Sequence, residues 1–324
     1  MPTDSDTQQK FRIVNREYLL SLTDTADFDI YARMSSDRNG QPVLLLKKGA
    51  SLDTLQSLLS SREGYSVLCI REEDHVRYWR VIEDSLQQMV NDPQTPVKRK
   101  ASLLYTCARD TMEEVFANPR SGENMDKART IVEAIIQLAI VDAVAIPHLL
   151  KLSAANYRAF THCINATVFS VGLWLTIGKG EDKDLREMAY GCILHDIGLG
   201  EIDPRIINKP AKLTSAEYTI VKRHPRLGYE MLTGLIPDAA LDVILHHHEK
   251  IDGSGYPEGL TGERISDSVK ICSIADVYDA LTSRRPYAGT RTPFEALLLM
   301  KERMAGHFEQ ENFLKFIHFL GDHR

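Results

Sequence analysis

The chain has 324 residues, 43% of them hydrophobic, so it can bury a sizeable core, and its length suggests two domains. The formal net charge is -6 with no basic stripe, which argues against a groove for a nucleic-acid polymer. The polar residues 1–10 carry no secretion signal, and no run approaches the roughly 18 apolar residues of a membrane span. Five scattered cysteines without paired spacing fit a reducing compartment. We therefore expect a cytoplasmic, globular protein that does not enter a membrane.

The N-terminal part predicts a small mixed α/β module after a disordered start. Residues 28–34 alternate between apolar and polar side chains, which is the period of a half-buried strand. A turn signal then leads into a second strand at 42–47. Ser51 can cap a short helix, and a third strand is predicted at 66–71.

A break that contains two prolines separates this module from the rest of the chain. A helix is predicted at 73–91, because apolar residues recur there at steps of three and four. Segment 91–96 places its prolines beside Asn and Asp, which stops a helix and favours an exposed linker. Residues 1–96 are thus predicted to form a regulatory or sensor module, and residues 97–324 an all-helical domain. The predicted fold class is mainly α, with a C-terminal helical bundle preceded by a small α/β module.

The second domain is predicted to be helical throughout. Amphipathic segments and capping signals predict helices at 97–117, 124–140, 154–177, 183–195, 214–224, 237–248, 266–282 and from 292 onward. Thr214 and Glu217 fit a capping box, and Thr292 starts the last long helix by the same logic. Pro225 is expected to interrupt the helix that ends at His224.

Histidines and aspartates gather on these apolar helices. Most lone His-Asp pairs lie on the surface, and a lone His162 is typical of a core histidine bonded to a backbone carbonyl. Here, however, six of the eleven histidines fall between residues 162 and 248. His195-Asp196 ends an apolar helix whose small residues would let a neighbouring helix approach closely, and Asp276 lies inside another apolar segment. Such a mixture of imidazole and carboxylate groups indicates a metal centre.

A glycine-rich loop at 249–260 follows the histidines and is typical of a lid or a binding loop. The ordered set of features resembles the HD-GYP family, part of the HD-domain superfamily of metal-dependent phosphohydrolases, over roughly residues 125–324. The matching features are His162, His195-Asp196, His224, His247-His248, the loop Asp252-Gly253-Ser254-Gly255-Tyr256-Pro257 and Asp276. The resemblance implies hydrolysis of the bacterial second messenger cyclic di-GMP to linear pGpG, with later conversion to GMP left open. In that chemistry a hydroxide bridging two metals attacks the phosphodiester in line.

Matched residue by residue, the resemblance implies two divalent ions, with iron or manganese expected first and zinc as a further candidate. One ion would be held by His162, His195, Asp196 and Asp276. Asp196 would bridge to a second ion, held by His224 and by one or both of His247 and His248. His195 and Asp196 are then the catalytic pair. Asp279 is expected to support the site, and His246 has no counterpart in the family.

The resemblance also implies a wall for the substrate, made by Gly255, Tyr256 and Pro257. Tyr256 could stack on guanine or simply pack the loop. Arg285 matches a residue that contacts phosphate. Lys209 and Lys212 are weaker candidates for phosphate contacts, because a solvated loop explains them at least as well.

Three departures from the family pattern matter. Arg158 stands where three-metal members carry a glutamate, so two ions are expected. Leu199 and Ala288 stand where the family usually has basic residues, which removes positive charge near the substrate phosphates. These two substitutions leave a second reading open, a weakly active or inactive cyclic di-GMP receptor that signals through its N-terminal module. An HD hydrolase acting on another nucleotide is disfavoured by the complete glycine-rich loop.

Residues 1–96 lie outside the resemblance and carry no receiver or cofactor motif. A protein partner, or a homodimer formed through this region, is an open expectation. Helix 73–91 could pair with its own copy or pack within its chain, and packing within the chain is slightly favoured.

Overall fold

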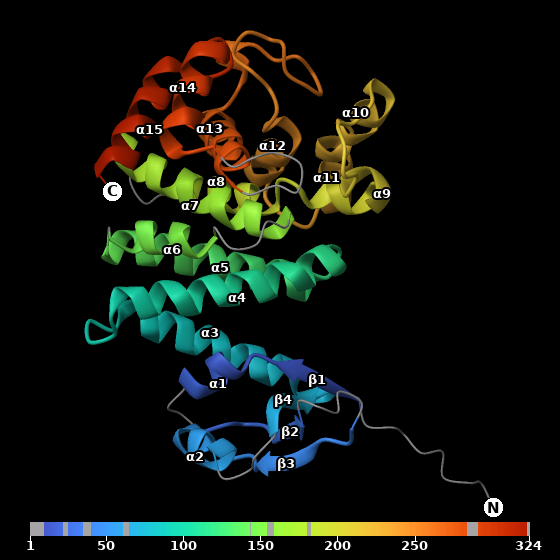
Figure 1. Ribbon diagram of the computed structural model, residues 1–324, viewed down its shortest axis with the longest axis vertical. Coiled ribbons are helices and arrows are strands. Elements are labelled where there is room, and N and C mark those ends of the chain that lie inside the picture. The colour runs from blue at the N-terminus through green and yellow to red at the C-terminus, as the bar shows by residue number, and fades with distance from the viewer. Residues whose placement is uncertain are drawn as a thin grey trace, which may run out of the picture. The chain divides into compact units, whose positions relative to one another are not determined.

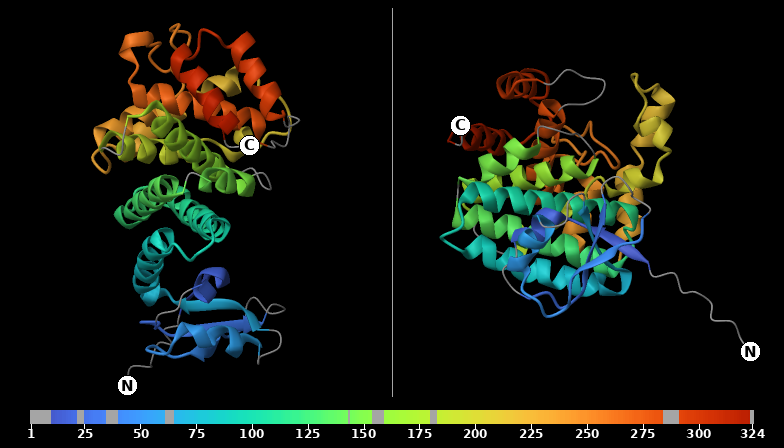
Figure 2. Two further views of the ribbon diagram at one scale, coloured as in Figure 1. Left: turned by 90° about the vertical axis from the view of Figure 1, so that its left-hand side faces the viewer. Right: turned by 60° about the horizontal axis from the view of Figure 1, so that its bottom comes forward.

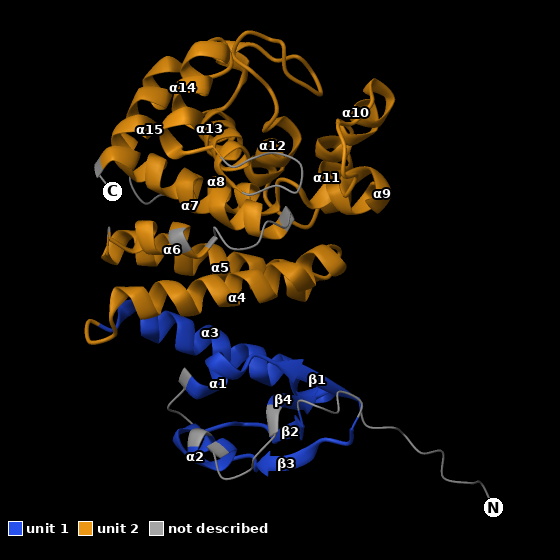
Figure 3. Cartoon of the chain, viewed as in Figure 1, with its two compact units in different colours: residues 1–92 blue, residues 93–324 orange. Residues whose placement is uncertain are grey.

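The computed structural model describes residues 10–21, 25–34, 40–60, 65–142, 144–153, 159–179, 183–283 and 291–322. The chain divides into two compact units, residues 1–92 (unit 1) and 93–324 (unit 2) (Figure 3). Unit 1 holds a small antiparallel sheet with short helices, and unit 2 is built of helices. The predicted fold class, mainly α with a small α/β module at the N-terminal end, is confirmed.

Unit 1 is built around a four-stranded antiparallel sheet in the order β1-β4-β2-β3 (Figure 1). Its elements are β1 (Phe11–Val14), α1 (Arg16–Ser21), β2 (Ile30–Met34), β3 (Val43–Leu46), η1 (Leu52–Thr54), α2 (Leu55–Ser60), β4 (Tyr65–Arg71), η2 (Glu72–Asp74) and α3 (His75–Asn91). The central strands β2 and β4 are buried on both faces: Ile30, Ala32, Leu68 and Ile70 are at most 1% exposed, and on the opposite face Tyr31 and Cys69 are 7% and 0% exposed. The half-buried strand expected from the alternation is therefore wrong for residues 30–32, which are covered on both faces.

The predicted disordered start is wrong for residues 11–14, which form β1. This strand pairs along its whole length with β4, from Phe11 opposite Arg71 to Val14 opposite Leu68. Four residues are too few to show a period in the sequence, and such a strand is specified by its pairing partner. The strands predicted at 28–34, 42–47 and 66–71 are confirmed as β2, β3 and β4, and the helix predicted at 73–91 is confirmed as α3.

Unit 2 is a helical bundle. Its elements are α4 (Val97–Ala117), α5 (Gly122–Val141), α6 (Ala145–Ser153), α7 (Ala159–Ile177), α8 (Lys183–Leu194), η3 (Ile197–Glu201), α9 (Pro204–Ile207), α10 (Ser215–Val221), α11 (His224–Leu232), α12 (Asp238–His246), η4 (Gly262–Arg264), α13 (Asp267–Thr282), α14 (Pro293–Arg303) and α15 (Gln310–Asp322). Helices α6, α9 and α11 are absent from the sequence prediction, and the single long helix expected from residue 292 onward is two helices, α14 and α15. In Figure 1 and the right-hand view of Figure 2, α9 and α10 (yellow) project from the rest of the unit beside α11.

Helix α7 lies at the centre of unit 2, in contact with α6, α8, α13 and α15. Its residues 160–177 are long and apolar enough to cross a membrane, but 83% of this stretch is buried inside the protein, as expected of a core helix. The expectation that no run approaches a membrane span is wrong for this helix, in which His162 and Asn165 interrupt an otherwise apolar run.

Glycines let the neighbouring helices approach closely. A Cβ on Gly191 of α8 would lie 2.6 Å from Val243 Cβ and 2.7 Å from the Ala240 carbonyl oxygen, both in α12. The close approach expected from the small residues before His195 is therefore present. Because α12 carries further histidines at its end, this contact helps to bring the two histidine-bearing segments together.

Capping signals located two helix starts correctly. Thr214 forms a capping box with Glu217 at α10, and Thr292 forms another at α14. The predicted helix 214–224 is wrong at its end, because α10 stops at Val221 and His224 is the first residue of α11. Pro225 lies in the first turn of α11, where a missing N–H leaves no helical hydrogen bond unmade.

Candidate metal centre

Five helices and the residues at their ends bring histidines and aspartates to one buried place in unit 2. They are His162 on α7, His195 and Asp196 after α8, His224 at the start of α11, His247 and His248 at the end of α12, and Asp276 on α13. All are buried except His248, which is half-buried. The seven residues that the resemblance implies as metal ligands therefore lie together.

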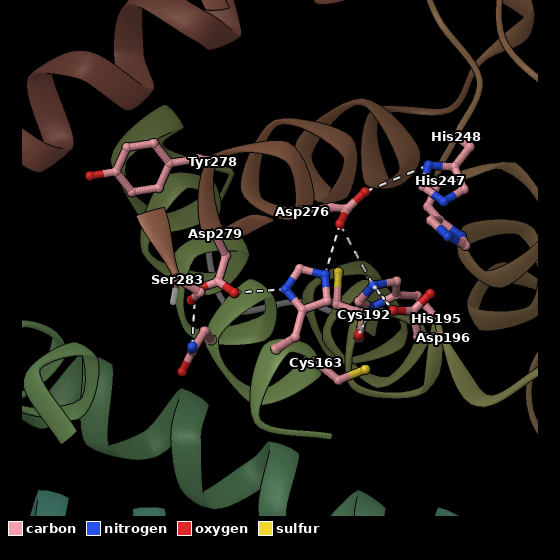
Figure 4. A network of polar contacts seen from close by, with 12 residues as sticks. Cys163, Cys192, His195, Asp196, His247, His248, Asp276, Tyr278, Asp279 and Ser283 are labelled. Carbon is pink, nitrogen blue, oxygen red and sulfur yellow. Dashed lines mark hydrogen bonds and ion pairs between the residues drawn. The ribbon is translucent and has the colours of Figure 1, made fainter. Parts of the chain in front are cut away.

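The candidate ligand atoms fall into two groups that share Asp196. One group is His162, His195 and Asp196, and the other is Asp196, His224, His247 and His248. In each group, one ligand atom per residue lies within 4.8 Å of the others. Asp276 lies beside both groups, with Oδ1 2.9 Å from His162 Nε2 and Oδ2 3.7 Å from His248 Nδ1 (Figure 4). A carboxylate common to two ligand groups is suited to bridging two ions.

Backbone carbonyls orient three of the histidine rings. The Nδ1 atom of His195 lies 2.7 Å from the Cys192 carbonyl oxygen. The Nδ1 atoms of His224 and His247 likewise face the carbonyl oxygen three residues earlier, at 2.8 and 2.9 Å. Carbonyls at helix ends lack helical partners and can accept these hydrogen bonds. A ring that donates through Nδ1–H presents the lone pair of Nε2 to a metal.

Two features of the site fit a bound cation. The buried Nε2 of His195 has no hydrogen-bond partner among the described residues, and the carboxylates of Asp196 and Asp276 are 3.7 and 3.9 Å away. The Nε2 atoms of His224 and His247 lie 3.1 Å apart, and His224 Nε2 is 3.2 Å from Asp196. With both Nδ1 atoms donating to carbonyls, two lone pairs and a carboxylate converge, and a divalent cation satisfies all three.

A second aspartate of α13, Asp279, contacts the nitrogen of the His162 ring that faces away from Asp276. Asp279 Oδ2 lies 2.6 Å from His162 Nδ1, and Asp279 Oδ1 accepts hydrogen bonds from the Asn165 amide at 2.9 Å and the Ser283 hydroxyl at 3.0 Å (Figure 4). A carboxylate behind a histidine fixes the ring's tautomer and raises the basicity of its other nitrogen. These contacts agree with the supporting role expected for Asp279 and with the shared face of His162 and Asn165.

The electrostatics favour neutral rings and ionised carboxylates over much of the site. Burial lowers the pKa of His247 well below its ordinary value and that of His248 to about 4. Burial by itself raises the pKa of Asp276, but the nearby rings of His162 and His248 outweigh burial and hold that pKa well below its ordinary value. Neutral rings beside carboxylates are the protonation state that a metal ion requires.

His195 is the exception, because its pKa is raised to about 10. Burial lowers that pKa, but the interactions with the Cys163 side chain and with the carboxylates of Asp196 and Asp276 outweigh burial. The two carboxylates that favour positive charge at this ring would favour a bound cation there in the same way.

A buried glutamate stabilises the conformation of the glycine-rich loop. The Glu249 carboxylate, 3% exposed, accepts hydrogen bonds from the backbone N–H groups of residues 258–260 at 2.7 to 3.1 Å. A Cβ on Gly255 would lie 2.5 to 2.6 Å from backbone atoms of residues 248–250, so only glycine lets the loop pack there. The centroids of the Tyr256 and His248 rings are 4.7 Å apart. The loop, which continues through Pro257, therefore borders the histidines.

The other residues singled out in the sequence have partners of their own, are exposed, or lie outside the described residues. The Nζ atom of Lys209 is bound by the Glu217 carboxylate at 2.7 and 2.8 Å, and Lys212 is exposed. His246 Nδ1 contacts Asp242 at 2.7 Å. Three residues lie outside the described part of the chain: Arg158, Arg285 and Ala288.

Sequence reasoning missed two residues that shape the site, Glu249 and Gly198. A Cβ on Gly198 would lie 2.1 Å from the His224 carbonyl oxygen and 2.6 Å from the Gly228 nitrogen. Both residues stand inside the quoted motifs, but a glutamate is usually solvated and a glycine usually serves a turn. Their position in the sequence next to predicted ligands could have drawn attention to them, but the contacts that they make are visible only in the fold.

Comparison with known proteins identifies the fold family. The profile of the family described as HD domain matches residues 146–311. The chain belongs to the HD-domain family. An HDG"Y"P protein of Bdellovibrio bacteriovorus has a similar structure, with a TM-score of 0.70 over 96% of this chain and 100% of that chain at 17% identity. That likeness shows a shared fold, and the recognition made from the motifs is confirmed.

Two curated relatives resemble this HD-domain protein in sequence. A cyclic di-GMP phosphodiesterase of Pseudomonas aeruginosa is 35% identical over 227 residues, which is 69% of this chain and 54% of the relative. The cyclic di-GMP phosphodiesterase response regulator RpfG of Xanthomonas campestris pv. campestris is 45% identical over 120 residues, 36% of this chain and 32% of the relative. The chain thus spans about half and about a third of the lengths of these relatives.

Proposed function

We propose that this HD-domain chain is a metal-dependent phosphodiesterase that hydrolyses cyclic di-GMP to linear pGpG. The observation that carries the proposal is the sharing of Asp196 by two converging groups of ligand atoms. Two ions on one carboxylate are the arrangement used for in-line displacement at a phosphodiester. The names of the two relatives support the choice of substrate.

The side chains divide the proposed work. One ion would be held by His162, His195, Asp196 and Asp276, and the other by Asp196, His224, His247 and His248. Bound ions would lower the pKa of water from about 15.7 to roughly 7 and neutralise charge on the phosphate. Asp279 and three backbone carbonyls keep the rings oriented. The Tyr256 ring, beside His248, offers a flat face on which a guanine can stack.

A second candidate function, a cyclic di-GMP receptor with feeble turnover, is favoured by one observation. Leu199 lies half-buried in η3, where the family usually has a basic residue, so this position supplies no charge to a substrate phosphate. Against it stands the complete ligand set, because buried carboxylates and histidines without a metal are costly. We favour the enzyme.

Turnover by anaerobically purified protein, loaded separately with iron(II) and with manganese, tests the proposal. We expect linear pGpG from cyclic di-GMP, loss of product in Asp196→Ala, and unchanged turnover in Asp184→Ala, a control at an exposed position of α8. Binding without turnover under either metal would make the chain a receptor. Because other relatives are named 3'3'-cGAMP-specific phosphodiesterases, that dinucleotide belongs in the same assay. Faster turnover of 3'3'-cGAMP would overturn the choice of substrate.

A further inference from the structure

Lys222 lies directly after α10, two residues before His224, and its ammonium group lies over two tyrosine rings. Its Nζ atom is 5.3 Å from the centroid of the Tyr218 ring and 5.8 Å from that of Tyr256. Tyr218 precedes Lys222 by four residues and so shares its side of the helix, whereas Tyr256 comes from the glycine-rich loop. The attraction between a cation and a ring face therefore holds Lys222 where two separate segments meet.

No carboxylate among the described residues forms an ion pair with Lys222. Two candidates, Glu217 on α10 and Glu258 in the glycine-rich loop, pair with other basic residues. Glu217 binds Lys209 and accepts a hydrogen bond from the backbone N–H of Thr214. Glu258 pairs with Arg226 at 3.0 Å. An ammonium group has three N–H donors, and ring faces occupy none of them fully. Lys222 is thus suited to receive an anion.

The position of Lys222 relates it to the candidate metal centre. The Tyr256 ring contacts both Lys222 and His248. Gly198 of η3 packs against the backbone of His224 at the start of α11. Leu199 is the next residue after Gly198, and Lys222 comes two residues before His224. The cation of Lys222 and the uncharged Leu199 thus lie on the two segments that meet at this contact.

We propose that Lys222 binds a phosphate group of the cyclic dinucleotide, and that Tyr218 and Tyr256 position its side chain for this contact. The inference rests on the proposed function. A cyclic dinucleotide carries two phosphates in one ring, so when one lies at the histidines and aspartates the other lies one ribose away. A cation one aromatic ring from His248 is placed to bind that second phosphate through charge-assisted hydrogen bonds.

Steady-state kinetics with manganese-loaded protein test the inference. Lys222→Met is expected to raise KM for cyclic di-GMP about 10- to 100-fold, the range for a lost hydrogen bond to a charged group, with kcat changed less than about threefold. Lys222→Arg, which keeps the charge, is expected to restore most of the loss. The control is Lys179→Met, since Lys179 also lies over an aromatic ring, at 5.3 Å from Trp174, but is ion-paired with Asp267.

Two further readouts separate a substrate contact from a structural effect. KM of the wild type is expected to rise with salt more steeply than KM of Lys222→Met, because only the wild type has this charge to screen. Metal content is expected to stay the same in both proteins. A KM of Lys222→Met within about twofold of the wild type would overturn the inference, and so would a loss of metal, which would mean that Lys222 acts through His224.

Equilibrium binding of cyclic di-GMP distinguishes failure of this inference from failure of the proposed function. If the wild type binds the dinucleotide without turnover, the enzymatic proposal falls, and weaker binding by Lys222→Met still supports the phosphate contact. If the wild type turns over the substrate and Lys222→Met binds it equally well, only the inference falls. A wild type that neither binds nor hydrolyses it overturns both.

Discussion

The candidate metal centre depends on the groups that orient its histidines as much as on the histidines themselves. Carbonyl oxygens set the rings of His195, His224 and His247, whereas a carboxylate sets the ring of His162. A charged partner strengthens the ligand more than a carbonyl does, because its negative charge increases the basicity of the far nitrogen. His162 is therefore the candidate ligand whose orientation we expect to be most sensitive to substitution of its partner.

Replacing Asp279 tests this support. Asp279→Asn keeps the size of the side chain but removes the charge behind His162, and we expect manganese affinity or turnover to fall about 10- to 100-fold. Isothermal titration with manganese measures the change. The control is Ser283→Ala, which removes only the hydroxyl bound to the far side of Asp279. Equal manganese affinities for Asp279→Asn and the wild type would show that His162 needs no carboxylate.

His246 lies next to two candidate ligands, and its own contact predicts a pH dependence of stability. The hydrogen bond that His246 donates to Asp242 raises the pKa of His246 above 6.5 despite burial, and the pKa of Asp242 is lowered below 3.8, where burial alone would raise it. The pair therefore stabilises the fold fully between the ordinary pKa values of the two side chains, 3.8 for Asp242 and 6.5 for His246. The contribution is lost as pH rises through the raised pKa of His246, and again as pH falls through the lowered pKa of Asp242.

His246→Asn is therefore expected to lower the unfolding free energy by about 1 kcal/mol or less near pH 5.5 and by less at pH 9. Urea unfolding of both metal-free proteins at each pH measures this difference. A difference that grows toward pH 9 would rule out the ion pair as its cause.

At the scale of elements, the contact between η3 and α11 decides where His224 lies. Gly198 allows the backbone of η3 to lie against the His224 carbonyl, and this brings Asp196 and His224 within 3.2 Å. We expect Gly198→Ala to lower the unfolding free energy by about 1–3 kcal/mol and to reduce metal content, because the added methyl group meets rigid backbone. Gly200→Ala is the matched control, since a Cβ at Gly200 meets nothing within 4 Å. Equal stability and metal content of the two variants would contradict this account.

Elements with a long period or a side-chain cap could be predicted from the sequence, and elements defined by their partners could not. The helices at α4, α5, α8, α12 and α13 follow from apolar periodicity, and the start of α10 follows from Thr214. The strand β1 exists through its pairing with β4, and α11 begins at His224 because the chain turns before Pro225. The seven implied ligands could be named from their motif, whereas the contacts of Glu249 and Gly198 required the fold.

At the scale of the whole molecule, the centre joins residues more than one hundred positions apart in the chain, so it exists only when unit 2 is folded. An ion that binds the folded chain more tightly than the unfolded chain stabilises it, by about 2.7 kcal/mol at one hundred times its dissociation constant. We expect manganese to raise the unfolding temperature in Trp79→Phe, in which the buried Trp174 of α7 is the remaining tryptophan. Its fluorescence reports on unit 2, and Asp196→Ala in that background is expected to show a much smaller rise. No response of the first protein to manganese would contradict a metal centre.

The central claim is that two metal ions share Asp196, and anomalous diffraction from crystals of the manganese-loaded protein tests it most directly. We predict two anomalous peaks on the order of 3.5–4 Å apart, one on each side of the Asp196 carboxylate. The histidines 162 and 195 should contact one peak, and 224, 247 or 248 the other. A single peak, or two peaks of which one does not contact Asp196, would contradict the shared carboxylate and the mechanism that depends on it.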